Sequence, residues 1–254
     1  MRVAVISTTV FPVPLAGYGG LEQVAWLCAR ELARLGHAVL LVAPLFSTAP
    51  PGVELHGTTL GEAEGQAFAG YRDRLASYDA VVDHSWQKWA YVWKRDAEAR
   101  APVLGVLHAP ADAMYAAPPP AEAPCLVALS EDQAGEVRRV LGCAARVCYN
   151  GIDLDQYSAD PALLRGRRYL FLARVSRLKG AHLAVDAVRR AGAALDVVGE
   201  DRLVEDPGYA HRIMRACSPP ALVYHGGVTR ARAVGFFRRA RALLHPNEHF
   251  REPF

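Results

Sequence analysis

Short apolar runs of strand length alternate with longer amphipathic stretches along most of the chain, and this alternation limits the fold more than any other feature. Arg2–Ser7 and His37–Pro44 are apolar over most of their length, which is typical of strands buried on both faces of a parallel sheet. Between them, apolar residues recur at helical spacing from Leu21 to Leu35, and Gly36 stands where a helix ends. These ranges predict a β-α-β unit, and the whole pattern predicts an α/β fold with doubly wound, mostly parallel sheets.

The same reasoning predicts the remaining elements. Strands are expected at Val53–His56, Ala80–His84, Val103–His108, Leu126–Leu129, Arg146–Tyr149, Tyr169–Ala173, Leu195–Val198, Leu222–His225 and Ala242–His245. Helices are expected at Glu62–Ser77, Gln87–Arg100, Glu131–Leu141, Ala181–Ala191 and Arg230–Arg241. Because the alternation breaks into a polar connector at Asp160–Arg168, we expect a domain boundary near residue 165, with domains at residues 1–165 and 166–254.

The end of the chain indicates that the second domain is incomplete. It holds about 90 residues, fewer than a doubly wound domain usually needs. The last residues, Glu252-Pro253-Phe254, form neither a polar tail nor a finished helix. We therefore expect a second domain that is truncated.

Composition excludes several classes of protein. With 52% hydrophobic and 22% charged residues the chain can bury a core, so global disorder is excluded. A net charge of +3 is too small to indicate a nucleic-acid partner. Five cysteines without a Cys-x-x-Cys pair argue against a disulfide framework or a zinc site. No cleavable signal and no apolar run of about 18 residues is present, so we expect a cytoplasmic globular protein.

A glycine-rich loop, Gly17-Tyr18-Gly19-Gly20, lies between the first strand and the helix that follows it. Glycines allow the backbone to approach a ligand closely, and a helix N-terminus favours anionic groups such as a diphosphate. The spacing is not that of a dinucleotide-binding fingerprint, so an NAD site is not predicted. A flexible loop without a ligand is the alternative.

Two segments of the second domain carry charges suited to a sugar nucleotide. In Ala173–Gly180, Arg174 and Lys179 lie five residues apart across a turn, so both cations could converge on one phosphate pair. In His245–Phe254, a carboxylate at Glu252 after a strand could accept hydrogen bonds from sugar hydroxyls. Taken alone, the first segment could be a solvated basic turn and the second a surface loop.

Together these segments resemble the glycosyltransferases of family 4, which have the GT-B fold of two Rossmann-like units facing across a cleft. Loops like Tyr18–Glu22 follow the first strand in that family, and segments like Tyr149–Asp153 close its first domain. Segments like Ala173–Gly180 open its second domain, and turns like Gly226–Thr229 lead through a helix to a strand ending in Glu-Pro-Phe. All of them occur here in the family's order.

The resemblance implies a retaining hexosyltransferase that uses a nucleotide-diphospho-sugar donor and needs neither a metal ion nor a cofactor. Arg174 and Lys179 would neutralise the leaving diphosphate, His108 would face the donor sugar, and Glu252 would engage it as the first glutamate of a Glu-x7-Glu motif. The second glutamate of that motif would fall after Phe254. The implied catalytic residues are His108, Arg174, Lys179 and Glu252, and the implied donor-binding residues are Gly19, Gly20, Arg174, Lys179, Gly199 and Val228.

Other functions stay open at this point. A nucleotide-sugar epimerase has a related architecture, although the Arg-x4-Lys spacing argues against it, and a shortened chain could be a non-catalytic binding remnant. Asp153-Leu154-Asp155 matches a metal-diphosphate motif of another glycosyltransferase fold, but its position argues against metal binding. Asp83-His84, at a strand end, either faces the ligand or is an ordinary loop pair.

The partners implied are a nucleotide-sugar donor and an acceptor that is a saccharide, a lipid or a small molecule. No nucleic acid is expected, although Arg230–Arg241 carries five arginines, and a weak contact with anionic lipid is left open. A homodimer is also left open, because an unfinished sheet exposes an edge. The long Pro110–Pro124 segment could border the acceptor.

Overall fold

The computed structural model describes residues 1–15, 17, 19–95, 100–111, 125–157, 166–201 and 206–247. These residues divide into two compact units. Met1–Leu15 and Gly19–Ile152 form the first unit, and the described residues from Asp153 onward form most of the second. The boundary expected near residue 165 lies outside the described residues.

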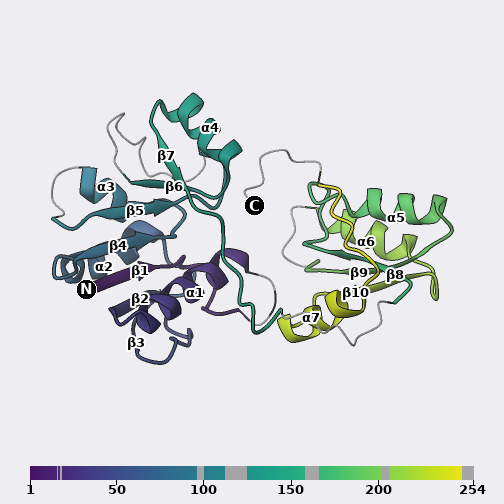
Figure 1. The fold of residues 1–254 in the computed structure, drawn as a ribbon, viewed down its shortest axis with the longest axis horizontal. Coiled ribbons are helices and arrows are strands. Elements are labelled where there is room, and N and C mark those ends of the chain that lie inside the picture. The colour runs from purple at the N-terminus through teal and green to yellow at the C-terminus, as the bar shows by residue number, and fades with distance from the viewer. Residues whose placement is uncertain are drawn as a thin grey trace. The chain divides into compact units, whose positions relative to one another are not determined.

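The first unit contains a seven-stranded parallel sheet (Figure 1) with the order β3-β2-β1-β4-β5-β6-β7. Its strands are β1 (Arg2–Ile6), β2 (Ala38–Pro44), β3 (Val53–Thr58), β4 (Ala80–Asp83), β5 (Val103–Val106), β6 (Leu126–Ala128) and β7 (Ala145–Val147). The order reverses beside β1, because β2 and β4 pair with its two sides. In such sheets ligands bind at the carboxyl ends of the strands, near the point of reversal.

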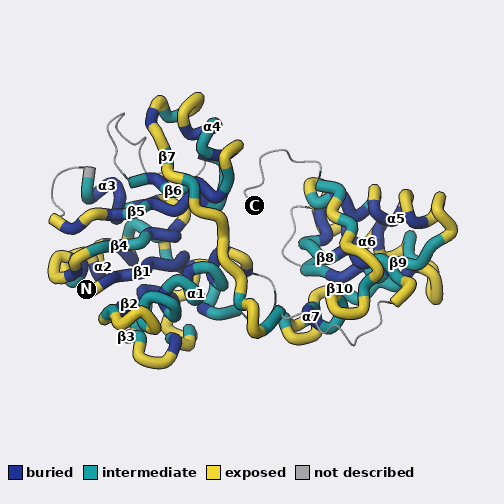
Figure 2. The backbone as a smooth tube through the Cα atoms, in the orientation of Figure 1, coloured by how far each residue is buried: buried dark blue, intermediate teal, exposed yellow. Residues whose placement is uncertain are grey.

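Helices cover both faces of this sheet, so β1 and β2 are buried after their first residues (Figure 2). The helices are α1 (Gly20–Arg34), α2 (Glu64–Leu75), α3 (Trp89–Arg95) and α4 (Glu131–Leu141). Successive strand residues point to opposite faces, and the core accordingly falls into two clusters. Ala4 and Ile6 of β1 pack with side chains of α2 and α3, whereas Val5 packs against Ala25 and Ala29 of α1.

The second unit has a smaller parallel sheet with the order β10-β9-β8, formed by β8 (Arg168–Leu172), β9 (Ala194–Val198) and β10 (Leu222–Gly226). The prediction of a strand at Ala242–His245 is wrong. Leu243 forms only an isolated bridge to Leu170, although the neighbouring backbone bonds to β8 are made. Pro246 follows directly and has no N–H with which to extend the ladder.

The helices of the second unit are α5 (Ala181–Arg190), α6 (Pro207–Ala216) and α7 (Arg230–Arg239). Helix α6 is not among the helices expected from the sequence, although the sequence contains signals for a helix start there. Asp206 caps the helix by accepting from the Tyr209 N–H at 3.1 Å, and Pro207 occupies the first turn. Tyr209 and Ile213, one turn apart, enter the core against α5 and β9.

The predicted fold class is confirmed, and most differences concern element ends. The helix predicted from Gln87 begins only at Trp89, because Lys88 has a backbone φ of 56°, which an α-helix does not allow. Helix α7 ends at Arg239 rather than Arg241, since Ala240 is already extended. Within the described ranges, no helix has the length and apolar character needed to cross a membrane.

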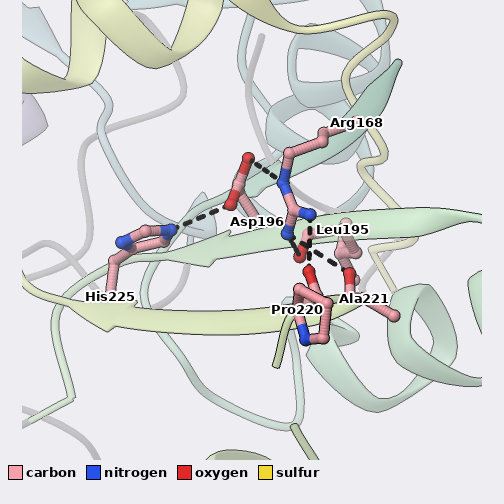
Figure 3. Close-up of polar contacts among 6 residues, drawn as sticks. All are labelled: Arg168, Leu195, Asp196, Pro220, Ala221 and His225. Carbon is pink, nitrogen blue, oxygen red and sulfur yellow. Dashed lines mark hydrogen bonds and ion pairs between the residues drawn. The ribbon is translucent and has the colours of Figure 1, made fainter. Parts of the chain in front are cut away.

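A polar cluster fixes the register of the second sheet (Figure 3). The Arg168 guanidinium donates from Nε to Asp196 Oδ2 at 2.9 Å, and from its two terminal nitrogens to the carbonyls of Pro220 and Leu195 at 2.7 Å. His225 Nε2 lies 2.9 Å from the other Asp196 oxygen. The Asp196 carboxylate therefore links β8, β9 and β10 through both of its oxygens.

We expect Arg168→Met to destabilise the second unit by about 2 kcal/mol, because it leaves a largely buried carboxylate and the carbonyls of Leu195, Pro220 and Ala221 without a charged donor. All four tryptophans lie in the first unit, so hydrogen exchange of β8 and β9 peptides is the suitable measurement. The matched control is Arg167→Met at the exposed neighbouring position. Equal exchange in both variants would show that the cluster contributes nothing to stability.

Candidate active site

In the first unit, polar side chains gather at the carboxyl ends of β1, β4 and β5, beside the reversal of strand order. Thr8 follows β1 and has no exposed surface, His84 follows β4 and is 3% exposed, and His108 follows β5. His84 is tied to the end of β1 by its backbone N–H, which donates to the Ile6 carbonyl at 2.8 Å. Adjacent parallel strands thus bring residues far apart in sequence to one edge of the sheet.

The loop between β1 and α1 is built around a buried carboxylate. Glu22 in the first turn of α1 is 4% exposed and accepts a hydrogen bond from the Thr8 hydroxyl at 3.0 Å. Burial raises the pKa of Glu22. Gly19 has a φ of 132°, and a Cβ there would lie 3.1 Å from a Glu22 carboxylate oxygen, so only glycine fits.

Gly20, the first residue of α1, has a different environment. Apart from its chain neighbours and the backbone of its own helix, no atom of the described residues lies within 4 Å of the position that its Cβ would take. The N-cap residue Gly19 has no side chain to satisfy the first amides of the helix. The start of α1 therefore offers backbone N–H groups beside open space, which suits an anionic group.

His84 and His108 form a direct pair at the ends of β4 and β5. His84 Nδ1 and His108 Nε2 are 2.8 Å apart, and the ring centroids are 5.1 Å apart. One nitrogen must carry a proton and the other a lone pair. Burial lowers the pKa of His84 to about 3 and the pKa of His108 well below its usual value. The pair is therefore neutral near pH 7.

Gln133 of α4 holds the backbone on both sides of His108. Its Nε2 donates to the carbonyls of Leu107 and Ala109 at 3.2 and 3.0 Å, and its Oε1 accepts from the Leu129 N–H at 2.6 Å. The side chain is buried, so these bonds do not compete with bulk water. Gln133 therefore fixes the position from which the His108 ring projects.

In the second unit, the loop 173–180 joins the carboxyl end of β8 to α5 and carries Arg174 and Lys179. Val175 and Ser176 are buried between these two cations, and the Val175 N–H donates to the Glu200 carbonyl at 2.8 Å. Gly180 N-caps α5 with a left-handed φ of 69°. The loop is thus anchored at its centre and at its end, while Arg174 and Lys179 stay partly exposed.

The loops after β9 and β10 lie beside this cationic loop. A Cβ on Gly199, which follows β9, would stand 1.6 Å from the Ala173 carbonyl oxygen, so the two backbones touch there. After β10, a Cβ on Gly227 would lie 3.3 Å from a Glu200 carboxylate oxygen. Val228 follows Gly227 in the turn that leads to α7. Arg174, Lys179, Gly199 and Val228 therefore occur on three neighbouring loops at one edge of the second sheet.

Sequence comparison identifies the family of the chain that carries these two sets of loops. The profile of Glycosyltransferase Family 4 matches residues 18–156, more than half of the chain. The chain belongs to Glycosyltransferase Family 4. The family 4 match covers the first unit from α1 onward, including both histidines, and leaves out β1. No curated protein sequence matched significantly.

Solved structures agree with the fold of this family 4 chain. AviGT4, a glycosyltransferase involved in avilamycin A biosynthesis, is 23% identical with a TM-score of 0.75 over 100% of this chain and 71% of its own. Anabaena HepE, solved with UDP-glucose, is 16% identical with a TM-score of 0.69 over 100% of this chain and 76% of its own. The catalytic domain of starch synthase IV from Arabidopsis thaliana, solved with ADP and acarbose, is 14% identical with a TM-score of 0.69 over 99% of this chain and 78% of its own. At these identities the likeness establishes the GT-B fold.

Some residues predicted for the family 4 site lie outside the described residues. These are Tyr18, Glu252 and most of Pro110–Pro124. Asp153, from the discounted metal motif, accepts the backbone N–H of Asp155 at 3.2 Å and so stabilises its own turn. Among the described residues, no three His, Cys, Asp or Glu side chains are grouped as metal ligands would be.

Three residues that shape the site do not stand out in the sequence. Thr8 and Gln133 act through hydrogen bonds to partners 14 and 26 residues away, so no local motif contains both members of either bond. Lys88 is fully buried. A lysine just before a helix is ordinarily expected to be exposed, so its sequence position does not predict this burial. From the sequence, His84 is either a ligand-facing residue or an ordinary loop residue. Its contact with His108 favours the first alternative.

Proposed function

We propose that this family 4 chain transfers a hexose from a nucleotide-diphospho-sugar to a hydroxyl acceptor, with retention at the anomeric carbon and without a metal ion. The observation that carries the proposal is the loop 173–180, which presents Arg174 and Lys179 at the carboxyl edge of the second sheet. A diphosphate is the leaving group whose charge matches two such cations. HepE, of the same fold, was solved with UDP-glucose.

The proposed step breaks the bond between the anomeric carbon and the diphosphate oxygen. The acceptor hydroxyl forms the new bond on the face that the leaving group vacates, and its proton passes to a diphosphate oxygen. Arg174 and Lys179 stabilise the negative charge that develops on the diphosphate. The N-terminus of α1, opened by Gly19 and Gly20, would offer backbone N–H groups to an anionic group.

We assign the sugar to the neutral His84–His108 pair and to Glu252. A neutral imidazole can donate to or accept from a sugar hydroxyl without adding a positive charge beside the anomeric carbon, from which the anionic leaving group departs. Glu252 would accept hydrogen bonds from donor hydroxyls. Gly199 and Val228 would border the nucleotide at the loops after β9 and β10. The acceptor would be a saccharide, a lipid or a small molecule.

Product analysis with and without a chelator tests the proposal. We expect UDP release from UDP-glucose in the presence of a sugar acceptor, a product with the α-configuration of the donor by proton NMR, and an unchanged rate in excess EDTA. A β-linked product would refute retention, and loss of activity that Mg²⁺ or Mn²⁺ restores would refute metal independence. Release of UDP with an epimerised free sugar would identify an epimerase instead. Binding of UDP-glucose without turnover would favour a non-catalytic remnant.

A further inference from the structure

Lys88, between β4 and α3, has no exposed surface although it carries an ionisable amine. Its backbone φ of 56° lies in the left-handed region, which is unfavourable for a lysine, and it is the one non-glycine residue with a positive φ in the described part of the chain. Such a conformation persists only where the surrounding contacts hold it, and it is concentrated at functional sites.

The contacts of Lys88 connect it to the turn that carries His84. Its ammonium donates to the Ser85 carbonyl, and its backbone N–H donates to the Ser85 hydroxyl at 3.2 Å. That hydroxyl and the Ser85 N–H both donate to Asp83 Oδ1, at 2.6 and 2.9 Å. The amine therefore stands directly under the turn Asp83–Ser85, with His84 at its centre.

The neighbouring strand leaves room for this side chain. Gly105 of β5 lies against it, and a Cβ on Gly105 would stand 3.6 Å from Lys88 Cδ and 3.3 Å from Leu126 Cδ2. On the other side, the Lys88 carbonyl accepts the N–H groups of Tyr91 and Val92 at 3.0 Å and so begins α3. The Lys88 side chain is thus held near the ends of β4 and β5, the strands that His84 and His108 follow.

Two carboxylates balance the charge of this amine. Burial lowers the pKa of Lys88 to about 8, while Asp83 and Glu64 oppose that shift. Glu64 of α2 also accepts the N–H groups of Trp86 and Gln87, at 2.9 and 2.6 Å, in the same loop. Tyr71 of α2 faces both carboxylates, and burial and these charges raise its pKa well above the usual value. The amine is therefore mostly charged at pH 7, with Asp83, Glu64 and the histidine pair as its titratable neighbours.

We infer that Lys88 is a positioning residue: its buried ammonium fixes the Asp83–Ser85 turn and holds the His84–His108 pair uncharged and mutually hydrogen-bonded. The inference rests on the proposed function only for the role given to His108. A proton added to either ring would put a second cation close to the ammonium, where little water can screen the repulsion. Lys88 accordingly contributes, after burial, to the lowered pKa values of His84 and His108.

The titration of Lys88 should be visible on the histidine rings of the unaltered protein. In nitrogen-15 NMR between pH 6 and 10, we expect the His84 and His108 ring signals, assigned with His84→Gln and His108→Gln, to shift with a midpoint near pH 8 while both rings stay neutral. The α-amino group of Met1 lies at the amino end of β1, at the opposite edge of the sheet from the two histidines.

Two variants and a control separate positioning from a general effect on stability. Lys88→Arg keeps the charge, so the inflection near pH 8 should vanish while the rings remain neutral down to pH 5. Lys88→Met removes the charge, so the inflection should vanish and the pair should take up its first proton at least one pH unit higher. Lys94→Met, on the adjacent helix α3, should leave the inflection in place.

The inference is overturned if wild-type histidine signals show no inflection between pH 7 and 9, or if the inflection survives in Lys88→Arg. It is also overturned if a folded Lys88→Met protein titrates its histidines as wild type does, because a purely structural role would lower the melting temperature alone. If Lys88→Met does not fold, the wild-type titration and Lys88→Arg decide. Absence of sugar transfer together with the expected inflection would refute the proposed function and leave this role standing.

Discussion

Arg174→Ala and Lys179→Ala each weaken the binding of UDP by roughly ten- to a hundredfold in calorimetric titration, if the donor diphosphate binds at the loop 173–180. Each substitution removes a charge-assisted hydrogen bond to phosphate, which contributes about 1.5–3 kcal/mol. Both side chains are partly exposed, whereas the loop is anchored by the buried Val175 and Ser176. The melting temperature should therefore change little.

Arg177 provides the matched control because it lies in the same loop and its side chain is exposed. Arg177→Ala removes the same type of charge from the same turn, so it reports the general electrostatic contribution of the loop. We expect it to weaken UDP binding less than threefold. Wild-type affinity in both Arg174→Ala and Lys179→Ala would place the donor diphosphate elsewhere.

Gly199→Ala should destabilise the second unit by at least about 3 kcal/mol, the upper end of the effects of overpacking. The added methyl group would stand 1.6 Å from the Ala173 carbonyl oxygen, so one of the two backbones must move. The bonds at risk are those that join the loops after β8 and β9, including Ala173 N–H to the Val198 carbonyl and Val175 N–H to the Glu200 carbonyl. Because Arg174 lies between them, UDP binding should fall together with stability.

Gly235→Ala is the control for this substitution. Gly235 lies inside α7 of the same unit, and its Cβ would meet only side-chain atoms of Arg239, at 3.5 Å or more. Alanine is the better helix former, so this variant should be neutral or more stable by up to about 1 kcal/mol. Hydrogen exchange of β8 and β9 peptides compares the two variants. Equal protection in them would contradict the close contact at Gly199.

Part of the site could be predicted because its residues lie in contiguous segments with a local signature. Arg174 and Lys179 are five residues apart on one turn after an apolar run, so their common loop follows from the sequence. The β1–α1 loop was recognised from its glycines. The contact between His84 and His108 could not be predicted in this way, because it spans 24 residues and depends on the pairing of β4 with β5.

The amino-acid sequence by itself determined the alternation of strands and helices, because each buried strand is a short apolar run and each helix repeats its apolar residues every three or four positions. It also determined the cationic loop and the family resemblance. Only the tertiary structure decided which strands are neighbours, and hence that Thr8, His84 and His108 share one sheet edge with Lys88 beneath them. It also showed Leu243 as a single bridge rather than a strand. Strand order and burial depend on contacts between distant segments, and a local pattern does not contain them.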